Sequence, residues 1–171
     1  RLRVDRLGPE VIGAARDAHR LPPLDVAVEP GQTYDMWGRE VQVLDAAGHT
    51  TGHVAYYLPR LAAAFTGDSL MALGCGRLFE GSAADMWATL TRLAALPDDT
   101  LICSGHEYTA ANGRFALSVD TENPALKERI AMTAKARALG TPTVPSSLSL
   151  EKATNPFLRA SDPRLKAALD M

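Results

Sequence analysis

Three turns in this sequence carry side chains that could bind a metal ion and support hydrolysis. His49 and His53 lie in the run GHTTGH, Asp68 lies in FTGDS, and His106 lies in CSGHEY. Imidazole nitrogens and carboxylate oxygens are the ligands that hold zinc, iron or manganese in hydrolytic sites. A single histidine in a loop is usually a surface or capping residue. The pattern gains weight because three separate turns share it.

Each of these turns follows a segment with the pattern of a β-strand. A strand is predicted where apolar residues alternate with polar ones or form a short run bounded by glycine or proline. Because neighbouring strands end at a common sheet edge, we expect His49 and His106 to lie near Asp68, from which they are 19 and 38 positions away. The predicted strands are 10–13, 33–37, 39–45, 54–58, 62–66 and 100–103.

Helices are predicted by capping residues and by the spacing of apolar side chains. Ser82 is a plausible N-cap, and Gly140 followed by Pro142 is a typical stop signal. The strand pattern ends near Ala110, so the sequence predicts two domains, 1–110 and 111–171, the second built only from helices. The predicted helices are 82–96, 124–139 and a short one that begins near Ser161.

Composition excludes several classes of protein. Of the 171 residues, 46% are hydrophobic and 22% are charged, which is typical of a globular chain with a folded surface of ~8,100 Å². No run of 18 apolar residues and no basic leader followed by an apolar stretch occurs, so neither a membrane span nor a signal peptide is expected. A net charge of −2 argues against a nucleic-acid partner. Cys75 and Cys103 lack metal-ligand spacing and are interpreted as reduced thiols, as in a soluble cytoplasmic protein.

Charge is unevenly distributed along the chain. Residues 21–110 contain 4 basic and 11 acidic residues, whereas residues 124–171 contain 8 basic and 4 acidic residues. One interpretation is that amphipathic helices expose solvated lysines and arginines. The other is that a basic segment attracts an anionic substrate toward an acidic catalytic segment. Charge alone does not decide between them.

The run GCGRLFEG at 74–81 has three glycines in eight residues. Glycines in such a density suit a tight surface loop that needs positive φ angles. They also suit a loop whose backbone approaches a ligand closely, with Arg77 offering its guanidinium to a carboxylate. Both interpretations remain open at this stage.

These motifs together resemble one known family. GHTTGH, FTGD, GCGRLFEG, GHEYT with Asn112, and NPFLR at 155–159 occur in the same order in glyoxalase II, the hydroxyacylglutathione hydrolases of the metallo-β-lactamase superfamily. The histidine and aspartate turns are shared across that superfamily, whereas the last three motifs are more specific to glyoxalase II. The resemblance runs from about Glu10 to the end of the sequence.

The resemblance implies an α/β (α+β) fold, a four-layer αββα sandwich followed by a small all-α domain. It implies a thioester hydrolase that cleaves S-D-lactoylglutathione to glutathione and D-lactate, the second step of methylglyoxal detoxification, by means of a metal-bound hydroxide. Two divalent metal ions are implied, usually zinc, with iron or manganese tolerated. Glutathione thioester is the implied partner, and a monomer is expected.

The resemblance also implies residue roles. His49 would bind one metal ion, His106 the other, and Asp68 would bridge both. His53 would orient its neighbours without binding metal. The implied contacts to the glutathione part of the substrate come from Arg77, Tyr108 and Phe79, the last of which replaces a tyrosine of many relatives.

One family motif has no counterpart here. The family carries Thr-His-x-His-x-Asp-His, which supplies four further ligands, and this sequence has no such stretch. We therefore expect an N-terminally incomplete sandwich, weak metal binding and little turnover from these 171 residues alone. We also expect exposed apolar sheet surface at Val41, Val43, Tyr56 and Phe65, through which chains could associate.

Two alternatives remain. A mononuclear iron persulfide dioxygenase shares the histidine and aspartate turns, although GHEYT and NPFLR speak against it. The second alternative is a non-catalytic module that binds glutathione conjugates through Arg77 and the basic segment without metal. Glutathione binding that persists in the presence of a chelator, without thioester hydrolysis, would support this second alternative.

Overall fold

The computed structural model describes residues 10–169 and has a six-stranded sheet at its centre. The strand order is β10-β9-β6-β5-β4-β3, with β6 and β9 parallel and the other neighbours antiparallel. These strands are β3 Thr33–Met36, β4 Arg39–Asp45, β5 Val54–Leu58, β6 Ala63–Gly67, β9 Leu101–Ser104 and β10 Ser146–Ser147.

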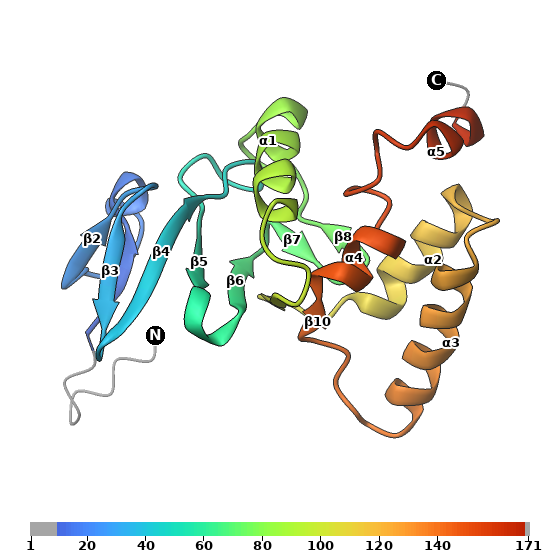
Figure 1. Cartoon of the computed structure of the whole chain (residues 1–171). Helices are drawn as coiled ribbons and strands as arrows, with labels where there is room; N and C mark the ends of the chain where they lie inside the picture. Colours follow the sequence, from blue (N-terminus) through green and yellow to red (C-terminus); the bar gives the residue numbers. More distant parts are fainter. Residues whose placement is uncertain (1–9, 170–171) are drawn as a thin grey trace.

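Two small strand pairs flank the central sheet. One is parallel and the other is antiparallel. In Figure 1 the first pair lies beside β3 and the second projects beneath α1 toward the helices. The parallel pair is β1 Ile12–Ala14 with β2 Val26–Val28, and the antiparallel pair is β7 Leu70–Met71 with β8 Gly74–Cys75.

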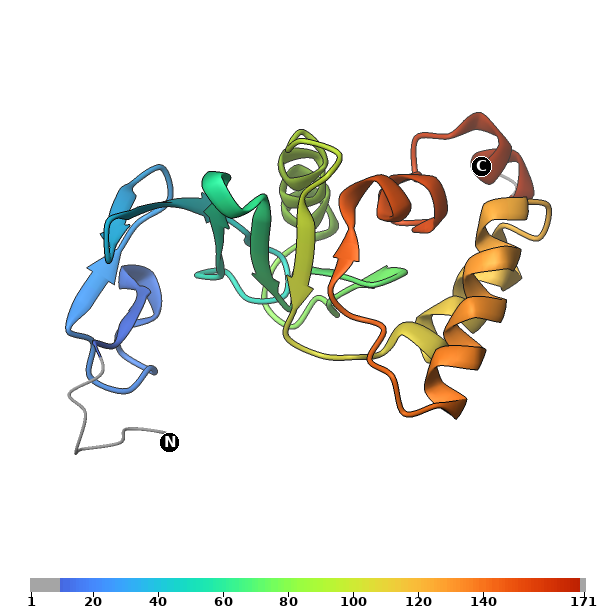
Figure 2. The same ribbon diagram turned by 60° about the horizontal axis from the view of Figure 1, so that its bottom comes forward.

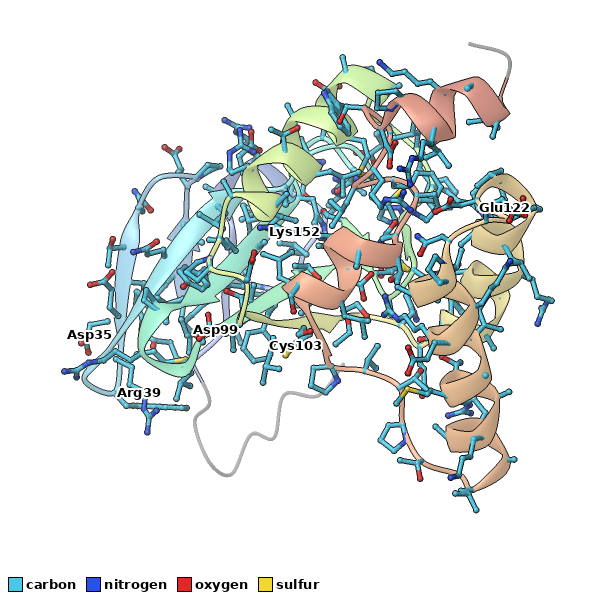
Figure 3. The ribbon with its side chains drawn as sticks, turned by 45° about the vertical axis from the view of Figure 1, so that its right-hand side comes forward. Asp35, Arg39, Asp99, Cys103, Glu122 and Lys152 are labelled. Atoms are coloured by element: carbon cyan, nitrogen blue, oxygen red, sulfur yellow. The ribbon has the colours of Figure 1, made fainter. Side chains whose placement is uncertain are left out.

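The helices gather at the β10 end of the sheet, apart from α1, which covers one of its faces (Figures 1 and 2). Figure 3 shows the length of the molecule, with Asp35 and Arg39 at the tip of the β3–β4 hairpin and Glu122 between α2 and α3 at the other end. The helices are α1 Ala83–Ala94, α2 Thr109–Val119, α3 Pro124–Ala138, α4 Leu148–Thr154 and α5 Pro163–Ala168, with short 3₁₀ turns at Ala15–Asp17 and Pro59–Leu61.

The main core lies between the sheet and α1. Helix α1 begins at a capping box in which Ser82 accepts from the backbone N–H of Asp85 and the Asp85 carboxylate accepts from the backbone N–H of Ser82. Its apolar side chains are spaced three and four residues apart and so share one face. The buried residues of this core are Ala46, Ala55, Tyr57, Ala64, Leu70, Met86, Leu90, Leu93, Ile102 and Leu148.

The opposite face of the sheet is incompletely covered. Phe65 is 48% exposed there, and a cavity of about 400 Å³ opens beside Tyr56 and Phe65. Val41 and Val43 are nevertheless buried, so the expectation that they are exposed is wrong. Ile12 of β1 lines the same cavity as Val41, which shows the small β1–β2 pair closing over this part of the face.

Most predicted elements are present, with boundaries shifted by one or two residues. The expectation that only helices follow Ala110 is wrong in one place, because β10 pairs antiparallel with β9. This strand has two residues, too few to show alternation in the sequence. It places the C-terminal segment at the edge of the central sheet, and α4 follows it directly.

Candidate metal and substrate site

The three predicted ligand turns meet at one edge of the sheet. His49 lies between β4 and β5, Asp68 follows β6, and His106 follows β9. The Oδ2 atom of Asp68 is 3.4 Å from Nε2 of His49 and 3.5 Å from Nε2 of His106. The predicted proximity of these side chains is therefore confirmed, and it arises because β6 pairs with both β5 and β9.

The His49 imidazole has a fixed orientation. Its Nδ1 atom is 2.8 Å from the carbonyl oxygen of Arg77. A carbonyl can only accept a hydrogen bond, so Nδ1 carries the hydrogen and the lone pair of the neutral ring is on Nε2. That lone pair faces the Asp68 carboxylate, which is also an acceptor. Two acceptors that face each other are stabilised by a cation between them, and this N–H to carbonyl arrangement is typical of metal-binding histidines.

The Asp68 carboxylate also fits a metal ion. Its Oδ1 atom is buried and has no hydrogen-bond partner among the described residues. A buried carboxylate oxygen without a partner is destabilising unless a cation or donor compensates it. Two glycines make this packing possible. A Cβ on Gly76 would lie 1.9 Å from the Asp68 carbonyl oxygen, and one on Gly105 would lie 2.9 Å from Oδ1.

Two aromatic rings flank the histidines. Phe79 lies against His49 with ring centroids 4.8 Å apart, and Tyr108 stacks on His106 at 5.1 Å with an interplanar angle of 14°. Phe79 is 69% exposed and Tyr108 is 52% exposed. These exposed rings form a surface on which an organic substrate could lie next to the histidines.

His53 lies behind the ligand turn. Its Nε2 atom is 3.3 Å from the carbonyl oxygen of Thr66, to which it can donate, and its ring is edge-on to that of His49 at 6.3 Å. Burial lowers the pKa of His53, which favours the neutral ring. Gly67, with φ +52°, allows this approach, since a Cβ there would lie 2.6 Å from Nε2.

The glycine-rich loop at residues 74–81 packs closely against other residues of the protein. Gly76 fits against Asp68 and His49, and the backbone carbonyl of Arg77 receives the His49 hydrogen bond. The Arg77 side chain is exposed. Sequence reasoning identified Arg77 through its guanidinium and missed its carbonyl, because a residue type does not reveal which backbone groups a fold will use.

Two glutamates that the sequence analysis did not identify hold the histidine turns. The Glu80 carboxylate accepts from the backbone N–H of Thr51 at 3.0 Å and pairs with Arg20. The hydrogen bond from Arg20 lowers the pKa of Glu80 to about 2. The motifs FEG and GHEYT contain Glu80 and its counterpart Glu107, but nothing local in the sequence indicates their distant partners.

Glu107 makes an equivalent set of contacts beside His106. Its carboxylate accepts from the backbone N–H of Thr143 at 2.9 Å and from the Thr143 hydroxyl at 2.7 Å, and it pairs with Arg137. The Thr143 hydroxyl bond is the main cause of a lowered pKa for Glu107. Both histidine turns are thus anchored by a carboxylate, a threonine and an arginine.

Many of the basic residues after Pro124 form ion pairs within the protein. Arg129 pairs with Glu151, Arg137 with Glu107, Lys152 with Asp98, and Arg159 with Asp120 and Asp162. These pairs join the helices to each other and to the sheet domain. Four of the eight basic residues in this segment therefore form ion pairs within the protein.

The described residues, 10–169, contain no group of three or more His, Cys, Asp and Glu side chains arranged around one metal position. His49 and His106 instead stand on either side of Asp68. Cys75 and Cys103 are free thiols, and burial raises the pKa of Cys75 to about 11, which keeps it protonated. Within the same residues, no helix combines the length and apolarity needed to cross a bilayer.

Comparison with known families places the chain in a class. Residues 6–106 match the family model described as metallo-beta-lactamase superfamily, and the chain belongs to that superfamily. Residues 107–171 match the model described as hydroxyacylglutathione hydrolase C-terminus. Hydroxyacylglutathione hydrolases are thus the particular members that this chain resembles, which confirms the resemblance that its motifs indicate.

A curated relative and two solved structures illustrate the similarity. The chain is 65% identical to the hydroxyacylglutathione hydrolase of Ruegeria pomeroyi over 98% of its own length. It resembles the di-iron-bound form of TTHA1623 with a TM-score of 0.57 and 28% identity, over 91% of this chain and 68% of that one. BLEG-1 B3 metallo-beta-lactamase shares the fold, with a TM-score of 0.64 and 20% identity over 90% of this chain and 67% of that one.

The chain spans slightly less than two thirds of its relatives. It covers 66% of the Ruegeria pomeroyi protein and 64% of the hydroxyacylglutathione hydrolase of Roseobacter denitrificans. The similarity to hydroxyacylglutathione hydrolases, in both the sheet domain and the C-terminal segment, does not favour a persulfide dioxygenase.

Proposed function

We propose that this chain supplies one side of the metal centre and the substrate surface of a hydroxyacylglutathione hydrolase. The reaction is the addition of water to S-D-lactoylglutathione, in which the thioester C–S bond breaks to give glutathione and D-lactate. The observation that carries the proposal is the position of His49 and His106 on either side of Asp68, with the His49 lone pair directed at the carboxylate.

In this proposal two divalent metal ions, zinc or alternatively iron or manganese, would be held by His49, Asp68 and His106 together with further ligands of the kind that the Thr-His-x-His-x-Asp-His motif supplies in the family. Such ions polarise a thioester carbonyl and make water acidic enough to react near neutral pH. The domain division at 110/111 separates the residues that hold metal from the helical segment that completes the substrate surface.

The chain's own residues orient the reacting groups. The Arg77 carbonyl keeps the His49 ring in one tautomer, and His53 packs edge-on behind it. Phe79 and Tyr108 present exposed ring faces beside the two histidines. The glutathione part of the substrate lies on these rings, and the Arg77 side chain faces one of its carboxylates. A glutathione thioester as partner and a cytoplasmic location fit this chemistry.

The test compares this 171-residue chain with a longer version that adds a Thr-His-x-His-x-Asp-His segment upstream. We expect the longer version to contain two metal ions and to hydrolyse S-D-lactoylglutathione, and the 171-residue chain to do both poorly. Full turnover with two bound metals in the short chain would contradict this account of the ligands. Glutathione-conjugate binding in chelator by both versions, without hydrolysis by either, would identify a binding module instead.

Histidine variants of the longer version locate the site. His49→Ala and His106→Ala should each lose metal and activity together, because each removes an imidazole ligand. His19→Ala is the matched control, since His19 is exposed and forms no ion pair with Asp68 among the described residues. Equal losses in all three variants would show that the effect is not specific to the site.

A further inference from the structure

The turn between β7 and β8 has an unusual backbone. It consists of Ala72 and Leu73, and Leu73 has φ +59°, in the left-handed region that side chains other than glycine rarely adopt. The Leu73 side chain is fully buried against Ala116 and Leu126, in a small second core formed with the helices. A strained conformation persists only where the surroundings hold it in place.

Polar side chains from the C-terminal segment bind the backbone of this turn. Asn155 Nδ2 is 3.1 Å from the carbonyl oxygen of Met71 and 3.0 Å from that of Gly74, to both of which it can donate. The N–H of Leu73 donates to Oε2 of Glu151 at 2.9 Å. Asn112 of α2 donates to the carbonyl oxygen of Ala72 at 3.0 Å. Each of the four residues from Met71 to Gly74 therefore has a backbone group that is hydrogen-bonded to a side chain of the helical segment.

Glu151 and Asn155, the two side chains of the C-terminal segment that bind the turn, are themselves held in place. Glu151 and Asn155 are both 0% exposed. Oε1 of Glu151 accepts from Arg129 and from the Ser146 hydroxyl, which leaves Oε2 directed at Leu73. Oδ1 of Asn155 accepts from the N–H of Phe157 at 3.1 Å, which fixes the amide so that Nδ2 points at the turn. The NPFLR motif thus begins with a donor aimed at the sheet domain.

The turn leads directly to the His49 ligand position. After β8, the N–H of Gly76 donates to the carbonyl oxygen of Ser69 at 3.2 Å, and Gly76 packs against Asp68 and His49. The next carbonyl, that of Arg77, receives the Nδ1 hydrogen of His49. That carbonyl lies three residues along the chain from Gly74, whose own carbonyl oxygen accepts from Asn155.

We propose that Asn155 and Glu151 are positioning residues for His49, although neither touches it. By fixing the strained β7–β8 turn, they place the Arg77 carbonyl where it selects the His49 tautomer with its lone pair on Nε2. The C-terminal segment therefore acts on the metal-binding side of the site as well as on the substrate surface. This inference rests on the proposed function only for its metal-binding readout.

The experiment uses Asn155→Ala in the 171-residue chain, with Asn123→Ala as the matched control. Asn123 is also a helix-associated asparagine whose Nδ2 donates to a backbone carbonyl, that of Ala153, but it has no contact with the turn. Nitrogen-15 NMR of the histidine rings is recorded without metal, at a pH about 2 units above the usual histidine pKa of ~6.5. Zinc affinity is measured separately on the longer version that carries the remaining ligands.

We expect His49 to be a single Nδ1–H tautomer in the parent and in Asn123→Ala, and a mixture of tautomers in Asn155→Ala. Zinc affinity should fall by about 10-fold in Asn155→Ala only, the lower end of effects found when a ligand's supporting contact is removed. If Asn155→Ala folds, loses as much stability as Asn123→Ala and still shows His49 only as the Nδ1–H tautomer, the proposal is overturned. If Asn155→Ala does not fold, the same readouts on Glu151→Gln against Glu128→Gln decide the question.

The two proposals can fail separately. Absence of zinc binding by the longer version that carries the remaining ligands would contradict the proposed function, while the tautomer measurement in metal-free protein would still test the positioning role. Normal zinc binding in the parent with an unchanged His49 tautomer in the variants would contradict the positioning role alone.

Discussion

The two histidines beside Asp68 share one kind of support and differ in another. Each turn is anchored by a glutamate that accepts from a threonine N–H and pairs with an arginine, Glu80 beside His49 and Glu107 beside His106. The His49 side chain is only 16% exposed, and its ring donates to a fixed carbonyl. The His106 side chain is 51% exposed and stacks on an exposed tyrosine.

The difference separates a rigid side of the site from an open one. On the His49 side, buried hydrogen bonds hold the β7–β8 turn, and the ring donates to the Arg77 carbonyl of the glycine-rich loop. On the His106 side, the ring and Tyr108 face solvent, where a substrate can approach. A hydrolytic site needs both properties, because its ligands must be preorganised while its substrate must enter and leave.

Asp68→Asn tests the element common to both sides and should have the largest effect. An amide is a weaker, uncharged ligand, so we expect metal binding to be lost at both positions. Metal-free stability should stay the same or rise, because the amide removes a buried charge on an atom without a partner. Metal content and thermal unfolding measure the two effects. Asp45→Asn is the control for metal content, since Asp45 also has a buried oxygen without a hydrogen bond but pairs with Arg16 and Arg92 outside the site.

Glu151→Ala tests the rigid side through its buried ion pair. Removal of the carboxylate leaves Arg129, which is 5% exposed, without its charge partner, and leaves the N–H of Leu73 without an acceptor. We expect a loss of about 3–5 kcal/mol in the free energy of unfolding. Glu128→Ala on the exposed face of α3 should change it by less than about 0.5 kcal/mol. Similar losses in both, measured by denaturant unfolding, would contradict a special role for the buried pair.

The three candidate ligand residues were easier to predict from the sequence than the contacts that support them. His49, Asp68 and His106 follow strands with clear patterns, and the sheet order brings their turns together. Tyr108, two positions after His106, was indicated only by the family resemblance. The sequence analysis could therefore place the three ligand residues without knowledge of distant contacts.

The supports of His49 could not be predicted in the same way. The left-handed Leu73 and the acceptors of Asn155 depend on contacts between residues 78–84 positions apart in the chain, and the Arg77 carbonyl binds His49, 28 positions away. Strand β10 was missed for a related reason, because its two residues acquire their conformation by pairing with β9. Local pattern identifies elements, whereas these features exist only once the elements pack.

Gly76→Ala and Gly105→Ala compare how tightly the His49 side and the His106 side of the site are packed. A Cβ at Gly76 would lie 1.9 Å from the backbone carbonyl of Asp68, whereas one at Gly105 would lie 2.9 Å from a side-chain oxygen. Backbone cannot move aside as a carboxylate can, so we expect Gly76→Ala to cost about 1–3 kcal/mol and Gly105→Ala less. Chemical denaturation of both variants gives the comparison. A larger loss for Gly105→Ala would show that the His49 side is the more adaptable one.

The smallest expected effect is the pH dependence that Glu80 confers on the His49 turn. Its folded pKa, about 2, is below the ordinary value of 4.5, mainly because Arg20 donates to the carboxylate. A depressed carboxyl pKa stabilises the fold above the unfolded pKa, and this contribution is lost as the pH falls from about 4.5 toward 2. Glu80→Gln cannot titrate, so the stability difference between parent and variant should be constant near neutral pH and shrink over that acid range. A difference that stays constant down to the acid end would mean that Glu80 is not ionised preferentially in the folded protein, and that the His49 turn is held by its other contacts.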